Sequence, residues 1–231
     1  MRQIKPLSDE RLDGFCAYCG NPPDSRDHVP SKIFLNKSFP ENLPVVASCT
    51  KCNQSFSLDE EYMACLLECT LCGTTNPNLV KREKIKKILK RKSKLRNRIE
   101  GAKRTVNGQT YFQTEVSRMK NVIKKLAYGH AKYENSEPKL VPPDKIWFTS
   151  VTILSDQEIT EFFNCEWSGT LPEVGSRALE RMLTNTSQGQ LLSQWIEVQV
   201  NNYYYSVAHN TEGFKVRMLI WDYLIAEVVW E

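Results

Sequence analysis

The sequence contains no long hydrophobic run. Its apolar stretches are a few residues long, whereas a membrane-spanning helix needs about 20 apolar residues in a row, so no membrane partner is expected. The first ten residues also lack the apolar core of a signal peptide, which predicts a cytoplasmic protein. Because that compartment is reducing, the eight cysteines are expected to be metal ligands or small core residues and not disulfides.

Internal repeats and low-complexity tracts are absent too. Charged residues make up 25% of the 231-residue chain and the apolar set 41%, which excludes a mostly disordered chain and a collagen-like one. The length suffices for one or two ordinary domains with hydrophobic cores.

The net charge of +4 conceals a strongly basic segment at residues 81–104, where thirteen Lys and Arg stand against Glu83 and Glu100. Its apolar residues recur at roughly helical spacing, so the pattern predicts one long amphipathic helix with a broad basic face. Such a face suits the phosphate backbone of a nucleic acid, although a merely solvated face is the simpler alternative. The predicted nucleic-acid contacts are Lys81, Arg82, Lys84, Lys86, Lys87, Lys90, Arg91, Lys94 and Arg98.

The first half of the chain divides into two predicted regions. Residues 1–75 hold seven of the eight cysteines, short strands in DHVPSKIFL and NLPVVASC, and a helix from Ser57 to about Gly73. Residues 76–135 form a basic helical region, which includes a second apolar stripe in SRMKNVIKKLAYGH.

Prolines at 138, 142 and 143 mark residues 136–145 as a linker. Residues 146–231 are predicted to form a small α+β region of unknown role, with helices in DQEITEFF and SRALERML. The alternation in WIEVQV and the turn residues NTEG at 210–213 predict an antiparallel sheet. The expected fold class is therefore α+β.

Two CxxC pairs lie in the first region. Cys16 with Cys19 and Cys49 with Cys52 are able to supply four thiolates to one tetrahedral Zn²⁺, which would leave no open coordination position. Such a zinc is structural, because it holds the fold and does not activate water. Cysteines that merely pack are the alternative.

Asp27 and His28 lie between these pairs, Asn42 precedes the second pair, and Asn53 directly follows it. This order, over roughly residues 13–60, resembles the HNH nucleases of the ββα-metal class in their zinc-knuckle version. The resemblance implies a ββα-metal HNH core, with Asp27 and His28 on the first strand and Asn53 on the helix. It also implies hydrolysis of nucleic-acid phosphodiester bonds.

The chemistry of these residues is compatible with the implied catalytic roles. A neutral imidazole is able to take a proton from water near pH 7, which makes His28 the general base. Carboxylate and amide oxygens are hard donors that suit Mg²⁺ or Mn²⁺, so Asp27 and Asn53 are the expected ligands of a catalytic cation. Asn42 is expected to pin the loop between the strands.

The assignment of Asp27 has a geometric condition. Neighbouring residues of a regular strand point to opposite faces, so Asp27 and His28 reach one phosphate only where the strand is twisted or ends. If the strand is regular there, Asp27 loses its role before His28 does.

Three more cysteines, Cys65, Cys69 and Cys72, fall on one face of the predicted helix at 57–73. Packing of small thiols is the expected reason, and a second metal site is the alternative. His130, His209 and the run Tyr203 to Tyr205 are expected to be structural, although these tyrosines could stack on unpaired RNA bases.

The predicted function is that of a metal-dependent HNH endonuclease that cleaves DNA in preference to RNA. The combination of DHVPSK, CTKCN and FSLDEEY also resembles small stand-alone bacterial HNH proteins. This resemblance implies a role in phage defence and a regulatory protein partner such as an ATPase. A zinc-stabilised nucleic-acid-binding module without catalysis is the main alternative. A thiol redox protein is disfavoured, because no CxxC pair begins a helix within a βαβ pattern.

Overall fold

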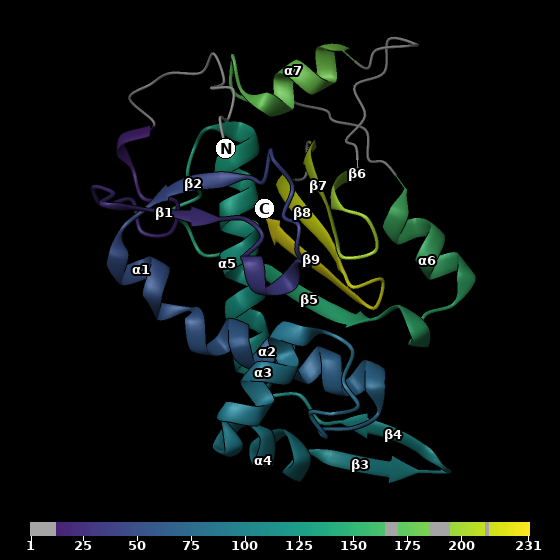
Figure 1. The fold of residues 1–231 in the computed structure, drawn as a ribbon. Helices are drawn as coiled ribbons and strands as arrows, with labels where there is room; N and C mark the ends of the chain where they lie inside the picture. The colour runs from purple at the N-terminus through teal and green to yellow at the C-terminus, as the bar shows by residue number, and fades with distance from the viewer. Residues whose placement is uncertain (1–12, 165–170, 185–194, 211–212) are drawn as a thin grey trace. The chain divides into compact units, whose positions relative to one another are not determined.

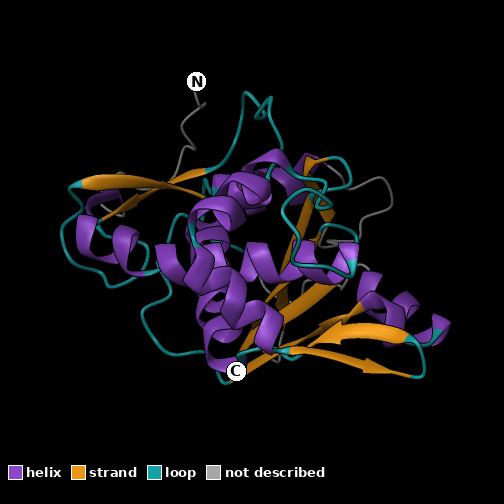
Figure 2. Cartoon of the chain, turned by 60° about the horizontal axis from the view of Figure 1, so that its bottom comes forward, coloured by secondary structure: helices purple, strands orange, loops and turns teal. Residues whose placement is uncertain are grey.

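A computed structural model describes residues 13–164, 171–184, 195–210 and 213–231 (Figure 1). Helices and strands are mixed along the chain (Figure 2). The strand pairings of the described residues are all antiparallel, which confirms the predicted α+β class. Residue contacts divide the chain into two compact units. The first unit combines residues 1–55 with 123–231, and the second comprises residues 56–122. No helix in the described ranges is long and apolar enough to cross a membrane.

The first unit begins with a β-hairpin and a short helix. Strand β1 (Ser25–His28) pairs with β2 (Val45–Ser48), and α1 (Thr50–Ser55) follows directly. The carboxylate of Asp24 accepts hydrogen bonds from the backbone nitrogen and the hydroxyl of Thr50, at 2.5 and 3.0 Å. Asp24 thereby accepts from a backbone N–H group that the first turn of a helix leaves unpaired. The same contact connects α1 to the start of β1.

A five-stranded sheet forms the other half of this unit, in the order β5-β9-β8-β7-β6. Asn210 pairs with Gly213, which confirms the predicted hairpin, while residues 211–212 lie outside the described ranges. The two predicted helices of this region are also present. The elements are β5 (Lys145–Ser150), a 3-10 turn (Val151–Ile153), α6 (Asp156–Phe163), α7 (Arg177–Thr184), β6 (Trp195–Gln199), β7 (Tyr203–Asn210), β8 (Gly213–Ile220) and β9 (Leu224–Trp230).

Helix α5 (Val116–Asn135) joins hairpin and sheet, and from Ile123 onward it belongs to the first unit. In Figure 1 this part of α5 lies between the β1–β2 hairpin and the five-stranded sheet. On the sheet side, His130 hydrogen-bonds to the Tyr203 hydroxyl at 2.8 Å, and both side chains are fully buried. On the hairpin side, a Cβ added to Gly129 would lie 2.5 Å from Val29, so glycine permits the close approach there.

The second unit is built from α2 (Ser57–Cys72), α3 (Glu83–Arg91), α4 (Ser93–Gly101) and the hairpin of β3 (Lys103–Val106) and β4 (Gln109–Phe112). Helix α2 ends at Cys72 and is capped by Gly73, whose φ of 65° is left-handed, which confirms the predicted end near Gly73.

The prediction of one long helix across the basic segment is wrong. The backbone leaves the helical region at Lys92 (φ −108°, ψ 72°), and the chain becomes a strand at Lys103. Both short helices pack on α2, and each buries its isoleucines. The break at Lys92 lets both α3 and α4 pack against α2. The sequence does not reveal this break, because the apolar spacing is similar on both sides of Lys92.

Candidate functional site

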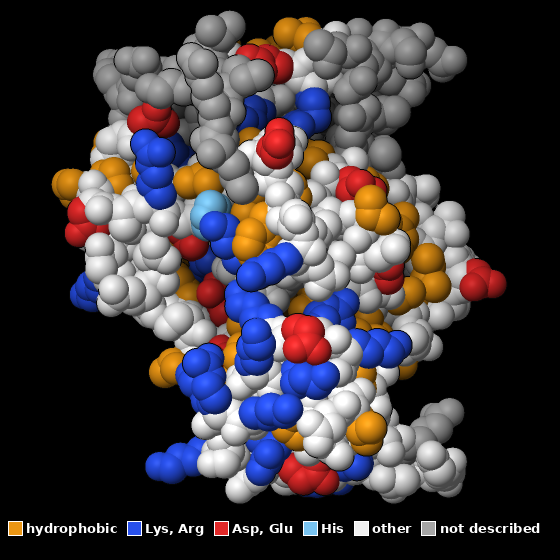
Figure 3. Space-filling model, viewed as in Figure 1, with side chains coloured by type: hydrophobic (Ala, Val, Ile, Leu, Met, Phe, Trp, Pro, Cys, Tyr) orange, Lys and Arg blue, Asp and Glu red, His pale blue; other side chains and the backbone are white. Residues whose placement is uncertain are grey.

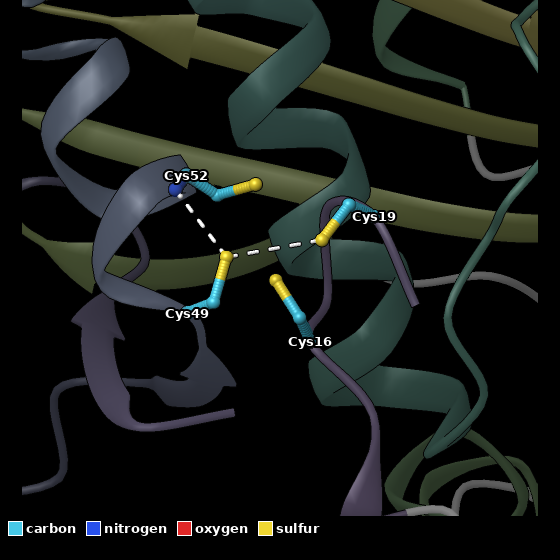
Figure 4. Close-up of side chains that lie close together, drawn as sticks. All are labelled: Cys16, Cys19, Cys49 and Cys52. Carbon is cyan, nitrogen blue, oxygen red and sulfur yellow. Dashed lines mark hydrogen bonds between the residues drawn. The ribbon is translucent and has the colours of Figure 1, made fainter. Parts of the chain in front are cut away.

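The four cysteines of the two CxxC pairs converge at one point (Figure 4). Cys16 and Cys19 come from the turn before β1, Cys49 follows β2, and Cys52 lies in α1. All four sulfur atoms lie within 4.8 Å of one another. This cluster thus joins the entry to the hairpin with the helix that leaves it.

The geometry of the cluster fits a tetrahedral zinc. Two sulfurs that are each about 2.3 Å from a tetrahedral ion lie about 3.8 Å apart, and Sγ of Cys19 and Sγ of Cys49 are separated by 3.8 Å. The backbone nitrogens of Tyr18 and Cys52 donate to Sγ of Cys16 and Cys49, at 3.5 and 3.4 Å. Amide donors stabilise thiolates, so these cysteines are able to hold a structural metal such as Zn²⁺.

Protonation opposes metal binding at this cluster. Burial raises the pKa of Cys16, and burial together with the neighbouring thiols raises the pKa of Cys52. The pKa of Cys49 is lowered, chiefly by the backbone N–H of Cys52. Since a thiol must lose its proton to bind zinc, binding at this site releases protons and weakens as the pH falls.

The alternative of a second metal at Cys65, Cys69 and Cys72 finds no support. Within the described ranges, only the Cys16 cluster brings together three or more His, Cys, Asp or Glu ligand atoms at metal-binding separation. Cys65 and Cys69 are fully buried in α2, and burial raises the pKa of Cys69 to about 12. Both are therefore protonated core residues, as the packing interpretation predicts.

His28 is the last residue of β1 and is half-buried. Its Nδ1 atom is buried and has no hydrogen-bond partner among the described residues, which is uncommon for a buried polar atom. Burial lowers the pKa of His28, the charges of Lys32 and Lys125 lower it further, and Asp27 partly opposes them. The imidazole is therefore neutral at pH 7, the form that a general base requires.

Asp27 is 8% exposed and points to the other face of β1. The ladder is regular here, since Asp27 pairs with Val46 and His28 with Val45. The Asp27 carboxylate accepts a hydrogen bond from the Tyr18 hydroxyl and forms an ion pair with Nζ of Lys125, each at 2.7 Å on the same oxygen. Asp27 is thus engaged by two donors within the protein.

The amide nitrogen of Asn53 donates to the backbone oxygen of Arg26 at 3.1 Å, which holds α1 against β1. Asn42 is exposed, and its side chain forms no hydrogen bond to a described residue, so its expected role in the loop is not seen. With Asp27 engaged and turned away from His28, these donors do not fit a divalent cation as they are placed. The Mg²⁺ or Mn²⁺ ion stays a prediction, and no step below depends on it.

The loop after His28 is held by the C-terminal sheet. The backbone nitrogen of Asn36 donates to the side-chain oxygen of Gln199 at 2.8 Å, and the indole nitrogen of Trp221 donates to the Phe34 oxygen at 2.8 Å. Phe34 belongs to a 3-10 turn, Lys32–Phe34. One role of the C-terminal region, which the sequence left open, is to support this loop.

Two of the residues predicted to contact nucleic acid form ion pairs within the protein. Nη1 of Arg82 lies 2.5 Å from the fully buried carboxylate of Glu68. Burial alone would raise the pKa of Glu68, but hydrogen bonds and charge from Arg82 keep it below its usual value. Arg98 forms a two-pronged ion pair with Glu115. In the sequence, Glu68 is a lone acidic residue in the apolar run of α2. That isolation was the available signal that Glu68 needs a cationic partner such as Arg82.

Other cations of the basic segment remain exposed, and Figure 3 shows Lys and Arg side chains crowded over α3 and α4. Lys86 pairs with the neighbouring Glu83 at 3.0 Å. The exposed side chains that form no ion pair with a described residue include Lys81, Lys87, Lys90, Arg91 and Lys94. These exposed cations lie on α3, just before it and at the start of α4.

Two of the three tyrosines at the start of β7 are core residues. Tyr203 and Tyr205 are buried, and the hydroxyl of Tyr205 donates to Glu134. The packing interpretation is confirmed for these two residues, which are closed to nucleic-acid bases.

In comparisons with known proteins, no family model, no curated protein and no solved structure matches this chain. The resemblance to HNH nucleases therefore rests on the residues and their order alone.

We expect about one zinc per chain, and replacing Cys49 by Ser should abolish stoichiometric binding. We expect the loss of zinc in the Cys49→Ser variant to reduce the free energy of unfolding by about 3 kcal/mol. In a chain of this size, that loss would lower the melting temperature by roughly 10 °C. Metal analysis and thermal unfolding followed by circular dichroism measure both effects. Cys72→Ser is the matched control, because Cys72 lies outside the cluster. Equal zinc content in both variants would contradict the assignment.

Proposed function

We propose that this protein is a nuclease that hydrolyses phosphodiester bonds, with His28 as the general base and DNA as the favoured substrate. The observation that carries the proposal is the His28 side chain itself, neutral and with an orphaned buried Nδ1 at the end of β1. Two independent features support it. A four-cysteine cluster braces the same hairpin, and the chain carries an exposed basic surface on α3 and α4.

The proposed reaction begins when the imidazole of His28 takes a proton from a water molecule. The resulting hydroxide oxygen bonds to phosphorus, and the bond between phosphorus and the 3′ oxygen breaks. Its electron pair remains on the 3′ oxygen, which receives a proton from solvent. The products carry 5′-phosphate and 3′-hydroxyl ends, as the resemblance implies.

The exposed lysines of α3 and α4 provide the affinity for substrate in this proposal. Contacts to the phosphate backbone are electrostatic and carry no sequence information, so we expect modest sequence specificity. DNA is favoured over RNA in part because two of the three tyrosines considered for base stacking, Tyr203 and Tyr205, are buried. The roles in phage defence and with an ATPase partner stay predictions of the resemblance.

Replacing His28 by Ala should slow nicking of supercoiled plasmid by at least about 100-fold, the usual contribution of a general base. Gel assays with the zinc-loaded protein, run with Mg²⁺, with Mn²⁺ and without added divalent ion, measure the rate. His209→Asn is the matched histidine control, because the half-buried His209 lies on β7, hydrogen-bonds to Asn135 and should not affect the reaction.

Equal nicking by the His28→Ala variant would assign the activity to another base or to a contaminant. Binding of DNA without cleavage under all three ionic conditions would reject the nuclease. The protein would then be a zinc-stabilised nucleic-acid-binding module.

Replacing Lys87 and Lys90 together by Gln should weaken DNA binding and make it less dependent on salt. Each lost phosphate contact reduces the slope of log K against log salt by about 0.9, so we expect a reduction of roughly two. Fluorescence anisotropy with a duplex at several salt concentrations measures the slope. The control, Lys120→Gln with Lys145→Gln, removes two exposed lysines outside the basic segment. An equal reduction in the control would show that general charge, and not α3, binds DNA.

A further inference from the structure

Lys125 of α5 is the least expected charged group near His28. It is 1% exposed, yet it carries an ammonium group within the first unit. Its Nζ lies 2.7 Å from Oδ2 of Asp27 and donates to the hydroxyl of Ser31 at 2.7 Å. Asp27 and Ser31 lie on either side of His28 in the sequence, so the ammonium bridges the end of β1 and the loop that follows.

A buried ammonium at this position disfavours a second cation on the same carboxylate oxygen. Oδ2 of Asp27 already accepts the Tyr18 hydroxyl as well as Lys125, and a divalent ion there would lie against a fixed positive charge that cannot turn to solvent. The two donors also complete the hydrogen bonding that a buried carboxylate oxygen requires. Lys125 therefore provides the charge that a metal would otherwise bring to Asp27.

Cations are also present on the side of β1 that carries His28. Arg26 precedes His28 by two residues on a regular strand, so both side chains point to the same face, and Arg26 is exposed. Lys32 follows in the 3-10 turn, and its charge acts on the imidazole of His28. A guanidinium is able to bind two phosphate oxygens at once and to stabilise the charge that develops on them.

We propose that the His28 site uses fixed side-chain cations in place of a divalent metal, with Lys125 neutralising Asp27 and with Arg26 and Lys32 binding the phosphate. This inference rests on the proposed nuclease function. Lys125 is a positioning residue that acts through Asp27 and holds the end of β1. The proton from water still passes to His28, and the 3′ oxygen takes its proton from solvent, so no co-reactant besides water is required.

The first test measures plasmid nicking by zinc-loaded protein in buffer freed of divalent ions by a chelating resin, with zinc content checked after the assay. The nicking rate should lie within about threefold of the rate with added Mg²⁺. Nicking that appears only with Mg²⁺ or Mn²⁺ would overturn the inference and leave the nuclease intact. Absence of nicking under every condition would instead overturn the proposed function.

The second test measures Mn²⁺ binding by electron paramagnetic resonance and needs no activity. Wild-type protein should bind no Mn²⁺ through Asp27. Any Mn²⁺ bound to wild type should therefore also be bound to the Asp27→Asn variant. Lys125→Met frees the carboxylate and should bind about one Mn²⁺ per chain, whereas the charge-conserving Lys125→Arg should not. Circular dichroism verifies the fold of each variant. Mn²⁺ bound to wild type through Asp27 would overturn the inference, and this readout remains decisive if Lys125→Met fails to fold.

Discussion

The convergence of four thiols is the constraint on which the candidate site depends. Two strands of four residues and a helix of six are too short to be stable alone. The cysteine cluster closes the ends of this small structure, and the Asp24 contact to Thr50 and the Asn53 contact to Arg26 fix the helix on the strand. His28 therefore lies at the end of a strand whose direction is set by several independent bonds.

A second feature is the distribution of charge, in which Glu68 and Asp27 are buried in ion pairs while several cations of α3 and α4 stay exposed. Arg82 forms an ion pair with the buried Glu68, and Lys125 forms an ion pair with the buried Asp27. Removing one member of such a pair leaves an uncompensated charge that costs about 3–5 kcal/mol. Arg82 and Lys125 are therefore needed to neutralise buried carboxylates. Lys87, Lys90 and Lys94, in contrast, remain exposed and suit a polyanion.

Local patterns in the sequence predicted local features well. The CxxC spacing predicted the cysteine cluster, the glycine after α2 predicted where that helix ends, and the alternation in WIEVQV and the turn residues at 210–213 predicted an antiparallel C-terminal sheet, although not its strand β5. The break at Lys92 was missed because apolar periodicity continues across it. The ion pair of Asp27 was missed because its partner, Lys125, lies on the distant helix α5. Lys125 is 94 residues beyond Ser31 in the sequence, and only the tertiary fold brings Lys125 to Asp27 and Ser31.

X-ray absorption at the zinc edge tests the central claim most directly, because it reports the atoms bound to the metal in the intact protein. Four cysteine thiolates predict a single shell of four sulfur atoms at about 2.3 Å, with no oxygen or nitrogen neighbour. That result would establish a closed structural centre that holds the hairpin and α1. A shell that includes oxygen or nitrogen at about 2.0–2.1 Å would contradict the account, since it would place the metal on other residues or leave a position open to water.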